Sequence, residues 1–170
     1  MSELIDFRKA KDDFFKNDHQ SPLSRDQRKA FTGLRYFPEN PDLRFELALE
    51  RAATPEQVVM ATSTGDQQEY WHAGQIHFAV HSQKAVLQVY QSVQGRDYFL
   101  PFVDATAPEE TYGAGRYLEP EQLPDGHLLV DFNRAYNPYC AYNDQWSCPL
   151  PPPANRLTVR VEAGELKFHD

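Results

Sequence analysis

Residues 111–118 combine glycine, tyrosine and arginine in a pattern that could bind an anion. Gly113 and Gly115 allow the backbone to approach a ligand closely or to turn at positive φ. Arg116 supplies a planar guanidinium that fits a carboxylate or a phosphate. The spacing matches neither a Walker loop nor a dinucleotide-binding fingerprint. The alternative is a glycine turn in which Arg116 pairs with a nearby acid. Those acids are Asp104, Glu109 and Glu110.

A second polar segment follows the strand expected at 127–133. Asp131 closes that strand, and the residues after it offer amide, phenol and thiol groups at the end of a sheet, where small-ligand sites form. The alternative is that these Asn and Tyr side chains satisfy the backbone of their own loop. The candidate ligand-binding residues of the two segments are Asp104, Thr111, Tyr112, Gly113, Gly115, Arg116, Asn133, Tyr136, Asn137, Cys140 and Tyr142.

Cys140 and Cys148 are the two cysteines of the chain. A zinc site would need about two further ligands, and neither a CxxC pair nor a nearby histidine accompanies them. A disulfide fits the loop length, but cytosolic reducing conditions oppose it. A cysteine nucleophile would need a base, and the sequence places no histidine beside Cys140. Two buried structural thiols are therefore the favoured interpretation.

Other metal-binding or acid–base pairs are not supported by their spacing. His77 and His81 would share one face of a strand, but about 13 Å would separate them. Glu109 and Glu110 are adjacent and point apart in an extended chain, which disfavours glycosidase-like chemistry. We expect no metal and no cofactor.

The elements that position these segments begin with helices. Apolar residues within 4–15 recur at helical intervals and predict one amphipathic helix. Ser24 and Gln27 have the spacing of a capping box and predict a second, short helix. Pro38 and Pro41 end this helical region.

Strands follow the helices. The expected strands are 44–51, 57–63, 68–73, 75–81, 85–93, 98–103, 127–133 and 157–162. Their connections are too short for crossover helices, which predicts a mainly antiparallel sheet. The fold class is therefore mainly β: an antiparallel barrel or sandwich of about eight strands, with two N-terminal helices and long loops. Residues 104–121 and 135–155 form these loops, and their aromatic content predicts that both are ordered.

Length and charge narrow the classes of function. The chain has 170 residues and a formal net charge of −8, from 25 acidic and 17 basic residues. This length favours one domain, 1–170, in which a helical segment, 1–37, packs on a β domain, 44–170. The acidic balance disfavours nucleic acid and anionic membranes as partners. The polar N-terminus differs from a signal peptide, so we expect a cytoplasmic location.

Six motifs together resemble those of an uncharacterised family, known as domain of unknown function 1684. They are GLRYFP at 33–38, FLPFVDAT at 99–106, ETYGAGRYL at 110–118, DFNRAYNPYCAY at 131–142, CPLPP at 148–152 and NRL at 155–157. The resemblance runs from about residue 31 to the end of the chain. It implies a bacterial or archaeal protein and assigns no catalytic role to any residue.

Three functional hypotheses remain open from the sequence. The preferred one is an uncharacterised protein that binds a small anionic molecule where the Gly-Arg loop meets the Asn-Pro-Tyr-Cys loop, with catalysis undecided. The second is a protein–protein interaction module or homodimer that uses the aromatic loops and the first helix. In the third hypothesis, both loops have a purely structural role.

Overall fold

The computed structural model describes residues 3–169 of the chain. Its two helices are α1 (Glu3–Asn17) and α2 (Arg25–Ala30), as predicted. The Ser24 hydroxyl accepts a hydrogen bond from the Gln27 N–H, and the Gln27 side chain accepts one from the Ser24 N–H. This capping box satisfies backbone groups that a helix N-terminus leaves without partners, and it starts α2 where the spacing predicts.

The larger sheet has five strands in the order β2-β3-β4-β5-β6, and every neighbouring pair is antiparallel. Its strands are β2 (Glu50–Ala61), β3 (Gln67–Val80), β4 (Gln83–Ser92), β5 (Tyr98–Phe102) and β6 (Arg116–Leu118). Alternate residues of β3 and β4 are buried, so one face of this sheet covers the core.

The smaller sheet has three antiparallel strands in the order β1-β8-β7. Its strands are β1 (Arg44–Leu47), β7 (Glu121–Gln122) and β8 (Leu128–Asp131). The chain also contains the short 3-10 helices Pro41–Leu43, Phe132–Arg134, Tyr139–Ala141 and Pro153–Asn155. The antiparallel, mainly β prediction is confirmed. The described strands form two sheets and do not close into the barrel that was one of the two expected forms.

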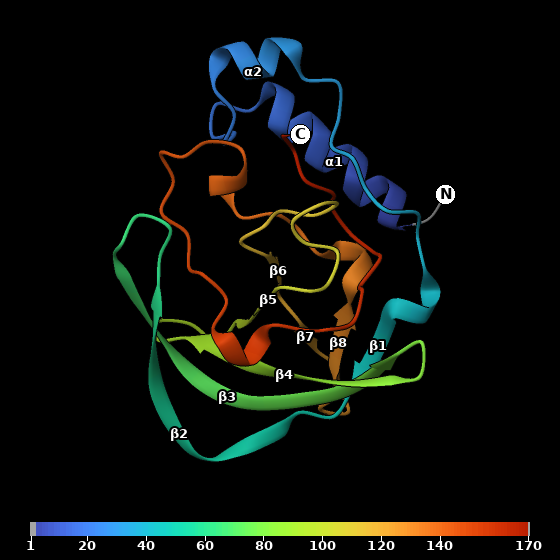
Figure 1. The fold of residues 1–170 in the computed structure, drawn as a ribbon, viewed down its shortest axis with the longest axis vertical. Helices are drawn as coiled ribbons and strands as arrows, with labels where there is room; N and C mark the ends of the chain where they lie inside the picture. The colour runs from blue at the N-terminus through green and yellow to red at the C-terminus, as the bar shows by residue number, and fades with distance from the viewer. Residues whose placement is uncertain (1–2, 170) are drawn as a thin grey trace.

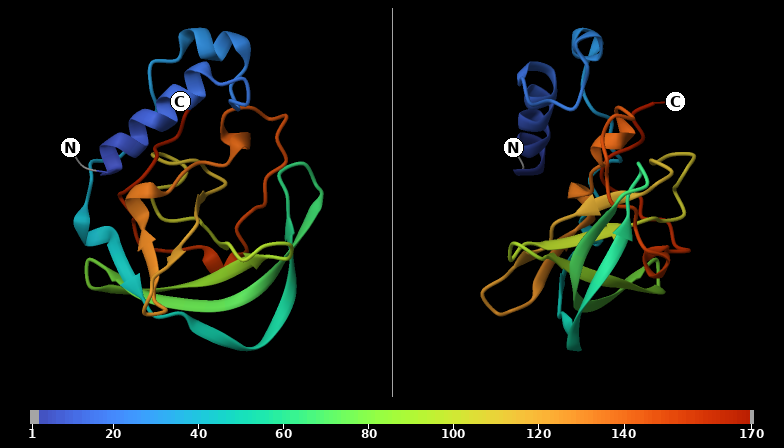
Figure 2. Two further views of the ribbon diagram at one scale, coloured as in Figure 1. Left: turned by 180° about the vertical axis from the view of Figure 1, so that it is seen from behind. Right: turned by 90° about the vertical axis from the view of Figure 1, so that its left-hand side faces the viewer.

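One apolar core joins the two sheets. Its fully buried side chains include Ile76, Leu87, Leu100, Phe102, Leu128, Val130, Phe132 and Val161. Figure 1 shows β3 and β4 curving beneath β1 and β8, with the helices at the opposite end of the molecule, and Figure 2 shows the same separation from the side. Loops fill the space between the helices and the sheets, and these loops contain both segments singled out from the sequence.

The predicted break at Ala73-Gly74 is wrong, because β3 continues through it. The pairing of β3 shifts register between His72 and Gly74, so the glycine lies in a bulge instead of a turn. Its φ is +152°, and a Cβ there would lie 2.2 Å from the Glu50 carbonyl oxygen of the neighbouring strand. The close approach of two backbones explains the glycine.

Other strand boundaries also differ from the predictions. Residues 157–162 form no strand, although Val159 and Val161 are buried. The strand expected at 44–51 ends at Leu47, and β2 begins at Glu50. His81 lies in the turn after β3 instead of in the strand. The short strands β6 and β7 lie in or beside a segment that was expected to be a loop.

The helices pack on the loops through a second apolar cluster. Phe15 of α1 makes an edge-to-face contact with Tyr142, with ring centroids 5.0 Å apart. Phe31 completes the buried part of this cluster together with Leu23. An ion pair between Lys11 and Glu165 joins α1 to the C-terminal segment. Of the helices in residues 3–169, neither is long and apolar enough to cross a membrane.

Candidate functional site

The two loop segments identified from the sequence lie against each other. Tyr117 and Tyr136 exchange two backbone hydrogen bonds, of 2.8 and 3.0 Å between nitrogen and oxygen. Their rings also make an edge-to-face contact. The Tyr112 hydroxyl, on the first segment, donates to Cys140 Sγ on the second at 3.5 Å. The meeting of the segments fits the arrangement that the preferred hypothesis requires.

Arg116 points into the core and forms an ion pair there. Its Nη2 lies 3.2 Å from Asp104 Oδ1, and the two residues are 1% and 3% exposed. The guanidinium also donates to the carbonyl oxygens of Val161, Ala163 and Glu165. Burial lowers the Arg116 pKa, and the Asp104 carboxylate opposes that shift. Of the two alternatives for Arg116, internal pairing with an acid is therefore the arrangement present.

Asp104 is a buried acceptor that organises the surrounding chain. It accepts hydrogen bonds from the Thr106 hydroxyl and from the Val161 N–H, the latter at 2.7 Å. The Thr111 hydroxyl lies 2.9 Å from the Thr106 hydroxyl and extends this network. Thus Asp104 holds this loop to the C-terminal segment, and Thr111 joins the network within the loop through Thr106.

Gly115 is required by backbone packing. Its φ is +101°, and a Cβ at this position would lie 2.5 Å from the Phe102 carbonyl oxygen. The close approach predicted from the sequence exists, but the neighbour is the protein's own backbone. Gly113, two residues earlier, is exposed.

The polar residues of the second segment also meet internal partners. Asn133 exchanges hydrogen bonds with the backbone of Asn40, at 2.8 and 2.9 Å. Asn137 Nδ2 donates to the Leu166 carbonyl at 3.0 Å. The Tyr142 hydroxyl donates to Glu165, and burial raises the Tyr142 pKa well above its ordinary value. These side chains tie the segment to neighbouring loops.

The two cysteines are close together and remain thiols in this structure. The Cys140 N–H donates to Cys148 Sγ over 3.3 Å. Cys148 is buried, and Cys140 is partly exposed. Within residues 3–169, no group of three or more His, Cys, Asp or Glu side chains is placed to hold a metal ion.

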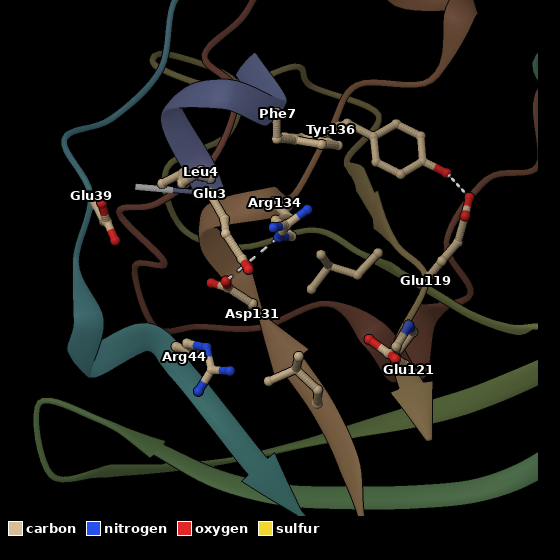
Figure 3. A pocket seen from close by; sticks show the side chains of 13 residues that line it. Glu3, Leu4, Phe7, Glu39, Arg44, Glu119, Glu121, Asp131, Arg134 and Tyr136 are labelled. Carbon is tan, nitrogen blue, oxygen red and sulfur yellow. Dashed lines mark hydrogen bonds and ion pairs between the residues drawn. The ribbon is translucent and has the colours of Figure 1, made fainter. Parts of the chain in front are cut away.

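A pocket of about 550 Å³ opens beside the two segments. Its lining comes from the first turns of α1, the start of β1, the connection from β6 to β7, and β8 with the residues after it (Figure 3). Leu4, Phe7, Leu118 and Leu129 provide apolar surface. Of the predicted ligand-binding residues, Tyr136 lines this pocket, and its hydroxyl donates to Glu119.

Charged side chains surround the apolar surface of the pocket. Five acids and two arginines line it: Glu3, Glu39, Glu119, Glu121, Asp131, Arg44 and Arg134. Arg134 is engaged, because its Nε lies 3.9 Å from Asp131 Oδ2 and its guanidinium covers the Phe7 ring at 4.7 Å. Arg44 is exposed, and within residues 3–169 no ion pair engages it. Figure 3 shows Glu119 and Glu121 across the pocket from Arg44.

Most of this lining lies outside the residues predicted from the sequence. Arg44 and Asp131 are far apart in the sequence and are brought together by the pairing of β1 with β8, in which their Cα atoms are partners. Glu119 and Glu121 flank Pro120, and this acidic pair was the sequence signal that could have marked one wall. No comparable signal marks Arg44.

Comparison with known proteins places the chain in a family. The model of the family described as "Protein of unknown function (DUF1684)" matches residues 29–166, so the chain belongs to that family and the resemblance found in the sequence is confirmed. One similar solved structure is the solution NMR structure of an uncharacterised protein from gene locus rrnAC0354 of Haloarcula marismortui. It is 38% identical, with a TM-score of 0.74, over 96% of this chain and 92% of that chain. No curated protein matches the chain.

Proposed function

We infer that the chain binds a small zwitterionic molecule with an aliphatic body in the pocket between α1 and β8. The observation that carries this inference is the placement of Arg44 opposite Glu119 and Glu121, across an apolar surface. The sequence favoured an anionic ligand at Arg116. Because the Arg116 guanidinium is bonded to Asp104 and three carbonyl groups, we assign the contact with the ligand's anionic group to Arg44.

Size and polarity favour a small molecule over a macromolecule. A volume of about 550 Å³ falls in the ordinary range of small-ligand pockets. Leu118 and Leu129 provide the contact for an aliphatic chain, and burying such a chain supplies most of the affinity. The charged rim supplies orientation, because each end of a zwitterion meets an opposite charge.

The lining supports binding better than catalysis. It contains no serine, cysteine or histidine among its described residues, so it offers no Ser–His or Cys–His pair of nucleophile and base. Two of its carboxylates are engaged, since Asp131 pairs with Arg134 and Glu119 accepts from Tyr136. We therefore propose a binding role and assign no reaction to the pocket.

An NMR titration with matched probes tests this proposal. The probes are free leucine, 4-methylpentanoate, which lacks the ammonium group, and 3-methylbutylamine, which lacks the carboxylate. We expect leucine to shift the amide signals of Leu118, Leu129 and Asp131 saturably, and to bind about tenfold more tightly than either analogue. No saturable shift at these amides with millimolar leucine would exclude the proposed ligand class.

Two arginine variants distinguish a specific contact at Arg44 from the general effect of removing a positive charge. Arg44→Gln should remove the preference for leucine over 3-methylbutylamine, because the amine never used the guanidinium. Arg96→Gln changes an exposed arginine in the connection between β4 and β5 and should leave the preference intact. Equal behaviour of the two variants would contradict the role of Arg44.

A second candidate function is self-association through exposed apolar side chains of the larger sheet. Val59, Trp71 and Val93 are 56%, 36% and 39% exposed, and the first two lie on the paired strands β2 and β3. β2 is an edge strand, so it can also accept a further strand. The proposed partner is a second copy of this chain. Sedimentation of the protein over a concentration series tests it, and a monomeric mass throughout would exclude this candidate.

A further inference from the structure

Cys140 and Cys148 lie close together at a place where neither takes part in the proposed ligand pocket. Cys140 lies in the 3-10 helix Tyr139–Ala141, and Cys148 follows after one short loop. The Cys140 N–H donates to Cys148 Sγ at 3.3 Å, so the second sulfur lies over the backbone of the first cysteine. The two thiols also share a hydrogen bond, which brings the sulfur atoms into contact.

Cys148 is held in place by the hairpin that joins β2 to β3. Its N–H donates to Ser63 Oγ at 3.1 Å, and its carbonyl accepts from the Ser63 N–H at 2.9 Å. Cys148 is 7% exposed, so reagents in solution reach it poorly. The neighbouring Ser147 hydroxyl lies 2.7 Å from Thr64 Oγ1 and adds to the anchoring. Cys148 is therefore a fixed and shielded thiol.

Cys140 has a more polar and more open environment. The Cys148 thiol donates to it and lowers the Cys140 pKa to about 6, although burial acts in the opposite direction. The Tyr112 and Ser63 hydroxyls also lower the pKa by donating to the same sulfur. The pKa of Cys148 is raised, because its proton is held in the hydrogen bond to Cys140 and the group is desolvated.

The surroundings leave Cys140 accessible to a small reagent. Its neighbour Tyr139 is exposed and stacks edge-to-face with Trp146 at the surface, with centroids 5.3 Å apart. Tyr112 and Tyr117 are the titratable side chains near the two sulfurs, and both have raised pKa values, chiefly through burial. Both phenols are therefore neutral at neutral pH and do not repel a thiolate.

We propose that Cys140 and Cys148 form a redox-active dithiol that exchanges with small disulfides, Cys140 attacking and Cys148 resolving. The proposal rests on the contact between the two cysteines, on the donors around Cys140 and on the shielding of Cys148. It is independent of the ligand pocket. Tyr112 acts as a positioning residue, because its hydroxyl stabilises the attacking thiolate. The expected co-reactant is a low-molecular-weight disulfide of the glutathione type.

The exchange proceeds in two steps that balance. The Cys140 thiolate attacks one sulfur of the reagent RSSR, whose S–S bond breaks, and RS⁻ leaves and takes a proton from solvent. Cys148 then loses its proton and attacks Cys140 Sγ, so the mixed disulfide breaks and a second RS⁻ departs with that proton. Two electrons pass from the protein to the reagent, giving one protein disulfide and two molecules of RSH.

Mass spectrometry of the native protein treated with oxidised glutathione tests the proposal. The unchanged protein should lose two hydrogens and retain no adduct, because Cys148 resolves the intermediate. Cys148→Ser should accumulate one glutathione adduct on Cys140. Cys140→Ser should remain unmodified, because the remaining thiol is shielded. An adduct retained by the unchanged protein, or modification of neither cysteine until the protein is unfolded, would overturn the proposal.

The pH profile of alkylation tests the role of Tyr112 separately from folding. In the Cys148→Ser background, the rate of Cys140 alkylation measures how much of Cys140 is thiolate after one hydrogen-bond donor is lost. Adding Tyr112→Phe should shift the midpoint of this rate profile to higher pH. The unchanged protein should have its midpoint near pH 6, the pKa of Cys140. Tyr139→Phe is the matched control and should leave the profile unchanged. Equal profiles for the two tyrosine variants would remove Tyr112 from the mechanism, and a midpoint of the unchanged protein near 9 would remove the reactive thiolate.

Discussion

Arg116 and Asp104 place two opposite charges in a region from which water is excluded. The 3.2 Å between Arg116 Nη2 and Asp104 Oδ1 allows attraction, while three backbone carbonyls accept the remaining protons of the two Nη groups. Desolvation costs several kcal/mol per ion, and only a complete set of partners offsets that cost. Arg116 Nε has no hydrogen-bond partner among the described residues, so the compensation is nearly, but not fully, complete.

Removing Arg116 should therefore destabilise the folded protein strongly. We expect Arg116→Ala to lower the free energy of unfolding by about 3–5 kcal/mol, because Asp104 would remain as an uncompensated buried charge. Urea denaturation measures this change. Arg160→Ala is the control, since Arg160 pairs with Glu110 and Glu162 at the exposed surface and should contribute little. A small loss from Arg116→Ala would instead mean that the pair is solvated.

Among the elements, the long strand β3 depends on its bulge. Two register shifts, one toward β2 and one toward β4, meet near Gly74 and let the strand curve over the core. Because a Cβ at Gly74 would lie 2.2 Å from the Glu50 carbonyl oxygen, one of the two strands must move when a side chain is added. The curvature of the larger sheet thus depends on a glycine at position 74.

A comparison of two glycine variants measures this effect. Gly65→Ala at φ +87°, with open space around it, should cost about 1–2 kcal/mol through backbone strain alone. Gly74→Ala should cost about 1–3 kcal/mol more, because the added methyl group also overpacks the strand contact. Thermal unfolding of both variants provides the measurement. Equal losses would show that β2 and β3 separate easily at the bulge.

The elements that were predicted correctly from the sequence carry local signals. The elements that were not predicted depend on contacts between residues far apart in the chain. The capping box of Ser24 and Gln27 is a local signal, and α2 begins there. Gly74 resembled a turn because a bulge glycine and a turn glycine have the same local sequence. The alternating Leu157, Val159 and Val161 resembled a strand, but the segment makes only isolated backbone hydrogen bonds, such as Leu157 N–H to the Val103 carbonyl, and these do not extend into a strand. β7 has two residues, too few for any periodicity.

At the scale of the whole molecule, the candidate site illustrates a different limit of sequence analysis. The predicted segments 111–118 and 131–142 do meet, but many of their polar groups bind to each other, to Asp104 and to the C-terminal segment. The pocket next to them is built from α1, β1, β8 and the β6–β7 connection. Residues so far apart in sequence carry no shared periodicity, so only the chain's folded path brings Arg44 opposite Glu121.

Buried tyrosines give the whole molecule an alkaline limit of stability. Burial is the main cause of raised pKa values at Tyr36, Tyr117, Tyr136 and Tyr142. A phenol whose folded pKa lies above its unfolded value near 10 stabilises the fold fully below about pH 10, and this contribution is lost as the pH rises further. Each such tyrosine should lower the free energy of unfolding by about 1.4 kcal/mol per pH unit above that point, which urea denaturation from pH 8 upward measures.

The variant Tyr142→Phe tests the contribution of one tyrosine. Its free energy of unfolding should fall less steeply with pH, by the amount that one tyrosine contributes, because phenylalanine has no proton to release. This difference in slope is expected whether or not the variant is less stable at pH 7. Tyrosinate absorbance that develops for all tyrosines while the protein stays folded would contradict the shift, since the phenols would then ionise without leaving the interior.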